Sequence, residues 1–319
     1  MSQFFRKNWF MLGLIGVATL AVGDISGITV SAGLWLKGHH GPDIVIMVIF
    51  FLSGLALNTR QIRTGISDYS GTFVALLLIF VSAPLVAILF CYLPLSSELL
   101  IGLLLVAAMP TTLSSGVVMT GSSGGNMAHA LLITILANSL AVLTIPLTLA
   151  FLLSFTGDNR IIEIDQLPIM IKIATRVLLP LIAGIILRNK AGALVKPILP
   201  YISVLNQTSI LFVVWMASCQ GREAIVASLG SVIPVILVTF VYHLILLFIA
   251  IAATEVTTIG KSRRESVILM GCQKTLPLSI ILQVSLFPEY GLALVVCVLH
   301  HITHLAMDAF LVQYLKTKK

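Results

Sequence analysis

The stretch Ala107-Ala108-Met109-Pro110-Thr111-Thr112-Leu113-Ser114-Ser115-Gly116 decides the fold, because it interrupts a long apolar segment. Pro110 lacks the backbone N–H that a helix interior needs, and Gly116 weakens the helix further. Four hydroxyl side chains stand between these two residues. In a membrane, a broken helix is tolerated only where it faces protein or a water-filled cavity. The pattern therefore predicts one half of a buried binding site.

The composition of the whole chain places this break in a membrane. Of the 319 residues, 58% are hydrophobic and 10% are charged, and the mean hydropathy is +1.09. Soluble domains carry roughly 25% charged residues, so a soluble enzyme and a nucleic-acid-binding protein are excluded. The chain has no Walker motif, which argues against transport driven by ATP. The four cysteines fall in apolar segments without a CxxC pair and indicate neither a redox compartment nor a metal site.

Ten apolar segments have the length of about 20 residues that a bilayer crossing needs. They cover residues 9–27, 43–58, 71–93, 98–121, 127–153, 167–188, 198–219, 231–254, 265–287 and 290–314. The connections between them, including 28–42 and 155–166, are too short for a soluble domain. We take the first segment as a retained helix rather than a signal peptide. The sequence therefore predicts an all-α polytopic membrane protein with ten transmembrane helices.

The basic residues are distributed unevenly over the connections. With the amino terminus inside, the inside segments hold 13 Lys and Arg residues and the outside loops hold 3. Inside are Arg6, Lys7, Arg60, Arg63, Arg188, Lys190, Lys196, Lys261, Arg263, Arg264, Lys316, Lys318 and Lys319; outside are Lys37, Arg160 and Arg222. Basic residues favour cytoplasmic loops, so we expect both termini in the cytoplasm. Because the chain shows no long leader or soluble tail, we expect a bacterial cytoplasmic membrane.

Ten helices divide into two halves of five, and an odd number per half requires the second half to be inverted. We expect these repeats at residues 1–155 and 166–319. The break at Ser114 then corresponds to residues 272–274, where the chain reads Met270-Gly271-Cys272-Gln273-Lys274-Thr275-Leu276-Pro277. This second patch is also polar and interrupted by Gly and Pro. Paired interruptions at corresponding positions are the best sequence indication of a transport site.

These two breaks, with the motifs around them, resemble the bile acid:sodium symporter family. The motifs are Gly54-Leu55-Ala56-Leu57, Pro110 to Ser115, Gly125-Asn126, Arg176-Val177-Leu178-Leu179-Pro180 and His300-His301. The opening Arg-Lys-x-Trp-Phe and the Lys274-Thr275-Leu276 element are similar to the family's divergent branch in bacteria and animals. The resemblance covers nearly the whole chain. It implies a panel of helices 1, 2, 6 and 7 against a core of helices 3–5 and 8–10, with broken helices 4 and 9 crossing where ions and an organic anion bind.

The chain departs from the sodium-coupled members of that family at the sodium ligands. Those members use a helix 9 glutamate in both sodium sites, and this chain lacks it. Ser115 and Thr134 match ligands of the first site, and Gln273 matches a ligand of the second. Other ligand positions are occupied by Gly116, Ala130, Ile79 and Leu269. The resemblance therefore implies at most one degenerate sodium site, at Ser115, Thr134 and Gln273.

Lys274 stands beside Gln273 in mid-span, where the symporters tend to carry an asparagine. An ionisable residue at membrane depth is a functional-site hypothesis by default. We expect its ammonium to replace a sodium ion, to hold the broken helices together and to attract an anionic substrate. A buried lysine can also release a proton during a transport cycle. The simpler alternative is that Lys274 only pairs with carbonyl groups freed by the break.

The hydroxyl residues of both breaks are candidates for the lining of the site. They are Thr111, Thr112, Ser114, Ser115 and Thr275. The amino termini of half-helices attract carboxylate, sulfate or phosphate groups, and these hydroxyls would cap them. The alternative is that they satisfy helix carbonyls.

Three polar residues recur on the fifth span. Thr134 and Asn138 share a helix face, and Asn126 lies near that face two turns earlier. They are expected to point at the break on the preceding span. Hydrogen bonding between helices, without a role in binding, is an equally good interpretation.

Histidines on the last span offer a different kind of site. His300, His304 and Asp308 are spaced i, i+4 and i+8, which suits a transition metal. A polar stripe facing the bundle interior is the commoner explanation, and neither an HExxH motif nor a cysteine supports the metal. The resemblance makes His301, on another face, the preferred substrate contact. His243 and His129 are single and give only a weak signal.

Polar residues of the sixth and seventh spans complete the candidates. Lys172 and Arg176 share a face of the sixth span, and snorkelling toward the membrane surface is favoured over pairing with a substrate anion. Asn206 and Gln207 are placed in the cleft between panel and core.

The sequence as a whole predicts a secondary transporter of an organic anion that works by alternating access, not an enzyme. We expect no cofactor, and either a coupling proton or facilitated transport without sodium. One alternative is sodium symport through the degenerate site. Another is a membrane-embedded metal-binding enzyme or a non-transporting regulator. The expected partners are an organic anion and the lipid bilayer, with no nucleic acid, and the expected assembly is a monomer or a weak homodimer.

Overall fold

The computed structural model describes residues 2–57, 69–156, 165–227 and 229–317. Within these ranges every regular element is a helix. Arg60, Arg63, Arg160, Lys318 and Lys319, which entered the prediction of orientation, lie outside the described residues.

The helices follow one another in this order along the chain. They are α1 (Ser2–Val22), α2 (Ile28–Gly38), α3 (Gly41–Ala56), α5 (Tyr69–Leu77), the π-helical turn η1 (Leu78–Ser82), α6 (Ala83–Cys91), α7 (Ser97–Ala108), α8 (Ser115–Ser122), α9 (Met127–Leu153), α10 (Gln166–Ile173), the π-helical turn η2 (Ala174–Leu178), α11 (Leu179–Lys190), α12 (Gly192–Val195), η3 (Leu199–Tyr201), α13 (Ile202–Gln220), α14 (Arg222–Ala227), η4 (Leu229–Ser231), α15 (Val232–Val256), α16 (Arg263–Cys272), α17 (Leu276–Leu286) and α18 (Gly291–Thr317).

Seven helical stretches of the described residues are long and apolar enough to cross a membrane. They are Tyr69–Cys91, Met127–Leu153, Gln166–Lys190, Leu199–Gln220, Val232–Val256, Arg263–Leu286 and Gly291–Lys316. Helices α2 and α3 form an eighth candidate, bent by 74°. The segments Trp9–Val22 and Ser97–Ala108 are shorter apolar helices. The protein is thus an all-helical, integral, multi-pass membrane protein.

Residues 28–42, expected as a plain connection, contain helix α2. Its start is organised by Asp24, whose carboxylate accepts hydrogen bonds from the Gly27 and Val30 N–H groups at 2.9 Å each. The same carboxylate accepts from the Ser26 and Thr29 hydroxyls at 2.7 Å each. These bonds satisfy backbone donors that a helix start leaves free. The apolar run of α2 is shorter than a membrane span, and for this reason the sequence pattern does not predict this helix.

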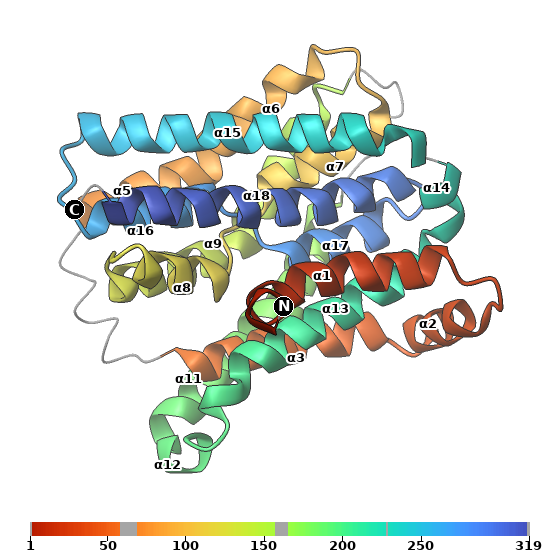
Figure 1. Ribbon diagram of the computed structural model, residues 1–319, viewed down its shortest axis with the longest axis horizontal. Helices are drawn as coiled ribbons and strands as arrows, with labels where there is room; N and C mark the ends of the chain where they lie inside the picture. Colours follow the sequence, from red (N-terminus) through yellow and green to blue (C-terminus); the bar gives the residue numbers. More distant parts are fainter. Residues whose placement is uncertain (1, 58–68, 157–164, 228, 318–319) are drawn as a thin grey trace.

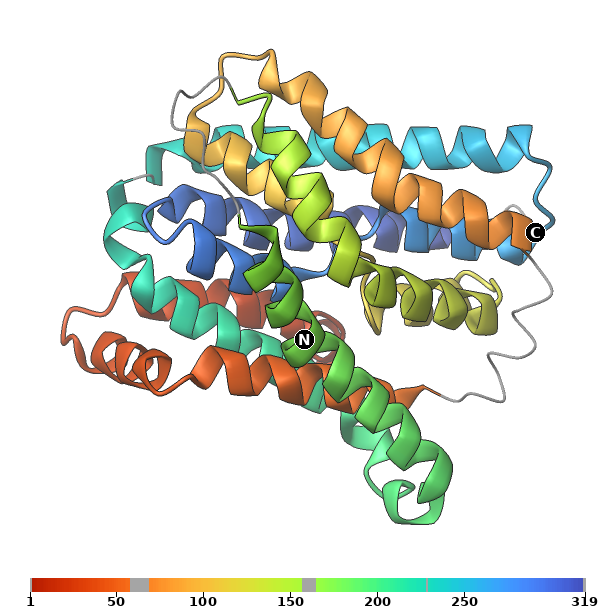
Figure 2. The same ribbon diagram turned by 180° about the vertical axis from the view of Figure 1, so that it is seen from behind.

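The helices form two groups, which lie one above the other in Figure 1. In the lower group, α3 packs on α11 and α13, and α13 packs on α1 and α2. In the upper group, α18 packs on α7 and α15, while α16 packs on α5 and α15. The continuous helix from α10 to α11 connects the groups, because α10 contacts α9 and α11 contacts α3 (Figure 2).

Within the lower group, α3 and α11 touch through their backbones at Gly54 and Gly184. A Cβ atom on Gly54 would lie 2.2 Å from the Leu181 carbonyl oxygen, and one on Gly184 would lie 2.2 Å from that of Phe51. No side chain fits at either position. Small residues allow membrane helices to approach this closely, so packing explains the glycine of the Gly54-Leu55-Ala56-Leu57 motif.

The helix pair α16–α17 forms the centre of the upper group. In this stretch 94% of the spanning window is buried inside the protein, compared with 33–50% in the other six single spans. Its polar residues therefore face other helices rather than lipid.

Candidate functional site

The two breaks predicted from the sequence meet in the structure. Residues 109–114 separate α7 from α8, and residues 273–275 separate α16 from α17. Both begin with extended backbone, since ψ is 149° at Met109 and 145° at Gln273. The Thr275 N–H donates to the Pro110 carbonyl oxygen at 3.0 Å. This bond joins the two breaks backbone to backbone.

A cavity of about 360 Å³ lies between the breaks and the lower group of helices. Its polar lining is Ser53, Thr112, Ser114, Ser115, Ser203, Asn206, Gln207, Thr275 and His301, and its apolar lining is Phe10, Met11, Ile49, Leu113, Val118, Met119, Ile210, Leu276, Pro277, Leu305, Ala306 and Ala309. No Lys, Arg, Asp or Glu is among these lining residues. Small-molecule sites typically measure about 300–1,000 Å³ and are mostly apolar with a few placed polar groups, which this cavity matches.

Two half-helices begin at the wall of the cavity. Helix α8 starts at Ser115 and α17 starts at Leu276, and their N-cap residues, Ser114 and Thr275, both line the cavity. Neither N-cap side chain forms a capping hydrogen bond. Helix amino termini carry a partial positive charge. Because the lining has no charged side chain, these helix ends supply positive potential to the cavity.

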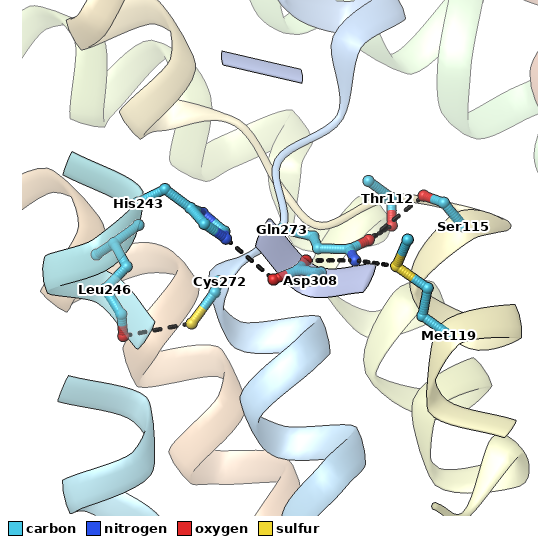
Figure 3. A network of polar contacts seen from close by, with 8 residues as sticks. All are labelled: Thr112, Ser115, Met119, His243, Leu246, Cys272, Gln273 and Asp308. Carbon is cyan, nitrogen blue, oxygen red and sulfur yellow. Dashed lines mark hydrogen bonds and ion pairs between the residues drawn. The ribbon is translucent and has the colours of Figure 1, made fainter. Parts of the chain in front are cut away.

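Gln273 connects the cavity to the interior of the upper group (Figure 3). Its side-chain oxygen accepts hydrogen bonds from the Thr112 hydroxyl at 2.7 Å and the Ser115 hydroxyl at 3.3 Å. Its amide nitrogen donates to Asp308 Oδ2 at 2.7 Å. His243 Nε2 lies 3.0 Å from the other carboxylate oxygen. Gln273 itself is fully buried, so it links groups at the cavity to a carboxylate that does not reach it.

The ammonium of Lys274 binds three backbone carbonyls. Lys274 is 2% exposed, and Nζ donates to Ile79 at 2.8 Å, Met109 at 2.9 Å and Ala107 at 3.2 Å. Ala107 and Met109 lie where α7 ends, and a helix carboxyl end carries unpaired carbonyls and partial negative charge. Lys274 is not among the cavity-lining residues. The structure thus shows the contact of the Lys274 ammonium with carbonyls freed by the break.

The predicted residues of the fifth span lie behind the first break. Thr134 donates to the Ala130 carbonyl at 2.9 Å and lies 3.5 Å from the Thr112 carbonyl. Asn138 donates to the Thr134 carbonyl at 2.9 Å and to that of Thr111 at 3.4 Å. Neither residue lines the cavity. They face the carbonyl side of the break.

Asn126 lies elsewhere. It is the N-cap of α9, where its side-chain oxygen accepts from the His129 N–H at 3.1 Å, and it is not a lining residue. Of the ten predicted site residues, the cavity brings together Thr112, Ser114, Ser115, Thr275 and His301.

The histidines form a buried cluster with His243. Ring centroids are 5.2 Å apart for His300 and His304, 4.6 Å for His301 and His304, and 5.7 Å for His243 and His304. Among the described residues no group of three His, Cys, Asp or Glu side chains has a geometry that could hold a metal ion. His300, His304 and Asp308 are all buried, so this stripe of the last span faces the interior of the protein.

The two basic residues of the sixth span have partners on other helices. Arg176 forms an ion pair with Asp43 of α3, and it is not one of the cavity-lining residues. Lys172 donates to the Ser285 hydroxyl. Both basic groups have partners on neighbouring helices, which sequence periodicity did not show.

Some cavity residues escaped the sequence analysis. Phe10, Ser53 and Ser203 line the cavity from α1, α3 and α13. Asn206 and Gln207, placed only loosely beforehand, line it as well. Asn206 donates to the Ser53 hydroxyl at 3.0 Å, and its own oxygen is buried without a protein partner. In the sequence, the feature that could have indicated these polar residues is a serine or an amide side chain within an otherwise apolar span.

The architecture defines the class of protein: a multi-pass membrane protein with two broken helices beside a cavity. The model of the SBF-like CPA transporter family matches residues 8–317. The chain belongs to this family, the bile acid:sodium symporter family, and the resemblance seen in the motifs is confirmed.

Relatives occur in plants and animals. The "probable sodium/metabolite cotransporter BASS4, chloroplastic" of Oryza sativa subsp. indica is 26% identical over 334 residues, covering 98% of this chain and 76% of the relative. Its counterpart in Arabidopsis thaliana is 30% identical over 285 residues, covering 83% of this chain and 63% of the relative. The "sodium/bile acid cotransporter 7" of Danio rerio is 26% identical over 328 residues, covering 98% and 94%.

Proposed function

We propose that this protein is a secondary transporter that carries an amphipathic organic anion by alternating access. The observation that carries this proposal is the cavity at the two breaks. Its wall combines hydroxyls and the amino ends of α8 and α17 with a mostly apolar remainder. Helix amino termini and hydroxyls suit a carboxylate, sulfonate or sulfate, and the apolar residues suit a hydrocarbon body. Membership in a transporter family favours this function over an enzyme.

Ten spans in two inverted repeats remain our description of the membrane domain. Counting α1, α3, α5–α6, α7–α8, α9, α10–α11, α13, α15, α16–α17 and α18 gives ten, with repeats at residues 1–155 and 166–319. If the two repeats are equivalent, α1 corresponds to α10–α11 and α3 corresponds to α13. The contact of α3 with α11 then corresponds to the contact of α13 with α1, and both contacts occur. The two breaks also correspond to each other. The panel would be α1, α3, α10–α11 and α13, moving against a core of the remaining spans.

The charge distribution supports a cytoplasmic location for both termini. The turn from α15 to α16, which holds Lys261, and the first residues of α16, Arg263 and Arg264, lie at the same end of the molecule as the carboxyl terminus (Figure 1). Helices α2 and α14, which hold Lys37 and Arg222, lie at the opposite end. Basic loops favour the cytoplasmic side. We infer a bacterial cytoplasmic membrane as the setting.

For the coupling ion, we infer transport without sodium. The Lys274 ammonium sits on carbonyl oxygens at the break, which is the kind of ligand a sodium ion would use. Sodium symport is the second candidate. It is favoured by the names of the relatives and by the proximity of the Ser115 and Gln273 oxygens. Thr134 would complete that site.

The test is thermal unfolding of the purified protein with benzoate, taurocholate and estrone sulfate as probes. Each is measured in potassium and in sodium buffer at several pH values. A ligand of the folded state stabilises it by about 2.7 kcal/mol at 100 times its Kd. We expect stabilisation by the amphipathic anions in potassium buffer, with no further gain from sodium.

Variants connect any stabilisation to the cavity. Ser115→Ala should weaken the effect of the probes, whereas Ser154→Ala should not, because the Ser154 hydroxyl is exposed and bonds to its own helix. Failure of all three anions to stabilise the protein contradicts the proposed substrate class. Stabilisation that requires sodium contradicts the inferred coupling and supports the second candidate.

A further inference from the structure

The carboxylate of Asp308 is a buried acidic group of the upper group that does not line the cavity. Asp308 lies on α18 and is fully buried. Its two oxygens meet His243 Nε2 at 3.0 Å and Gln273 Nε2 at 2.7 Å (Figure 3). No Lys or Arg side chain of the described residues contacts it. An ionisable group at membrane depth is expensive and marks function by default.

The ionisable groups around Asp308 come from three elements. Helix α15 contributes His243, which contacts Asp308, and Tyr242, whose ring lies 5.7 Å from that of His300. Cys272 and Lys274 come from the end of α16 and the second break, beside Gln273. Helix α18 contributes His300, His301 and His304, whose rings contact one another and that of His243. Met119 and Ser115 of α8 contact Gln273 rather than Asp308, and neither side chain ionises near neutral pH. The Lys274 ammonium is bound to backbone carbonyls. Among the described residues, no Lys or Arg therefore fixes the Asp308 carboxyl group in its charged form by direct contact.

We propose that Asp308 is the proton-binding site of the transport cycle. When Asp308 is protonated, the side-chain amide of Gln273 rotates, and this rotation changes the hydrogen bonds at the cavity wall. The proposal rests on the transport function proposed above. One proton binds the carboxylate from one side of the membrane and leaves it to the other. No electron moves, and the only covalent bonds that form or break are the O–H bond of the carboxyl group and the N–H bonds of the imidazoles that pass the proton.

The protonation state of Asp308 determines which way the Gln273 amide is oriented. We call this link from Asp308 through Gln273 to the Thr112 and Ser115 hydroxyls the relay. An ionised carboxylate only accepts, so it holds the Gln273 NH₂ group and turns the Gln273 oxygen toward Thr112 and Ser115. Both hydroxyl protons are then used on Gln273. A protonated Asp308 donates, so the amide turns its oxygen toward the carboxyl and its NH₂ group toward the hydroxyls.

Rotation of the Gln273 amide changes the number of hydrogen-bond donors that face the cavity. Thr112 already accepts from the Gly116 N–H at 3.1 Å, and its second lone pair can accept from the Gln273 NH₂ group. The Thr112 and Ser115 hydroxyl protons are then free to point into the cavity, which both residues line. Additional donors favour an anion. Proton binding and anion binding therefore strengthen each other, and such coupling is reciprocal.

The histidines provide a route for the proton. His301 lines the cavity, its ring lies 4.6 Å from that of His304, and His304 lies 5.7 Å from His243 between centroids. His243 contacts Asp308. Both ring nitrogens of His304, and Nδ1 of His243 and of His301, are buried without a protein partner. Imidazole can accept a proton on one nitrogen and donate from the other.

The first experiment needs no substrate. Infrared difference spectra of the purified protein, recorded as the pH falls, should show the carbonyl band of a protonated buried carboxyl. The band should be missing in Asp308→Asn and present in Glu265→Gln. Glu265 is the other carboxylate that is buried in a spanning helix among the described residues, at 5% exposure. The amide band of each variant reports whether it is folded. Persistence of the band in Asp308→Asn, its absence from the native protein, or its removal by sodium at constant pH overturns the proposal.

The second experiment tests the relay with taurocholate binding. In the native protein we expect affinity to rise as the pH falls, by at most tenfold per pH unit because one proton is linked. Asp308→Asn and Gln273→Met should both abolish this dependence, and Gln273→Met should retain the infrared band. A pH dependence that survives in Gln273→Met refutes the relay. If the native protein binds taurocholate at no pH, the proposed function fails for this probe, while the infrared result still decides the proton site.

Discussion

The break between α7 and α8 and the break between α16 and α17 resemble each other in composition and differ in what their side chains face. The first spans six residues and the second spans three. The first turns Thr112 and Ser114 toward the cavity, with Ser115 directly after it. The second turns only Thr275 toward the cavity and buries Gln273 and Lys274 in the protein. The first break is therefore suited to contact a ligand, and the second to fix the first in place.

The cause of this difference is the position of the two helices. The α16–α17 stretch is surrounded by protein over 94% of its spanning window, so its polar side chains find partners on neighbouring helices. Lys274 reaches across to carbonyls of α7 and of η1. Substitutions in each break can test this difference, and equal effects in both breaks would contradict it.

The largest effect is expected for Lys274→Met. The substitution keeps most of the volume and removes three hydrogen bonds to buried carbonyls, each of which is costly when unsatisfied, at about 1–3 kcal/mol. We expect a loss of stability of about 3 kcal/mol or more, measured by denaturant or thermal unfolding in detergent. Lys172→Met, which removes a lysine from the exposed pair with Ser285, should change stability by less than about 1 kcal/mol. Equal effects of the two substitutions would contradict the anchoring role.

The next effect is expected for Gly116→Ala, where the two breaks press on each other. A Cβ atom there would lie 2.6 Å from Met270 Sδ, 2.9 Å from Thr112 Oγ1 and 3.0 Å from Gln273 Oε1. Overpacking of this kind costs about 1–3 kcal/mol, and it should also weaken the stabilisation by taurocholate. Gly16→Ala is the control, because nothing lies within 4 Å of a Cβ atom at that position. A neutral result for Gly116→Ala would mean that the breaks are loosely packed.

A smaller effect on stability, with a clear effect on binding, is expected for Thr112→Val. This substitution removes the hydroxyl that bonds to Gln273 at 2.7 Å and accepts from Gly116 at 3.1 Å. A hydrogen bond contributes about 0.5–1.5 kcal/mol, so taurocholate affinity should fall by roughly threefold to tenfold. Thr254→Val removes a hydroxyl bonded to its own helix in α15 and should leave affinity unchanged. Equal losses of affinity in both variants would show that the first break has no particular role.

The smallest effect concerns pH and lies outside both breaks. Hydrogen bonds from the Ser26 hydroxyl, the Val30 N–H and the Thr29 hydroxyl hold the pKa of the Asp24 carboxyl well below its usual range. A lowered folded-state pKa gives stability that is present above the unfolded pKa of about 3.9 and is lost as the pH falls below it. Native protein and Asp24→Asn should therefore keep a constant difference in unfolding temperature between pH 8 and pH 5, and converge below about pH 4. A difference that changes near neutral pH would contradict this assignment.

The sequence revealed the breaks because a polar run is conspicuous in an apolar span, and the correspondence of Ser114 with residues 272–274 then followed from counting. It could not reveal where a side chain points. Lys274 faces the end of α7 rather than the cavity, and this depends on how two distant segments pack. The contact of His243 with Asp308 joins residues 65 positions apart, and the pair of Arg176 with Asp43 joins two different spans. Periodicity within one helix contains no information on either.

The backbone contact of Gly54 with Gly184 has a consequence for biosynthesis. Helix α3 leaves the ribosome long before α11, and its flat glycine surface has no partner until the second half of the chain has been made. The lower group therefore cannot assemble during synthesis of the first half. The glycine contact can close once α11 has been inserted, whereas the contacts of α18 with α7 and α15 must wait for the last span of the chain.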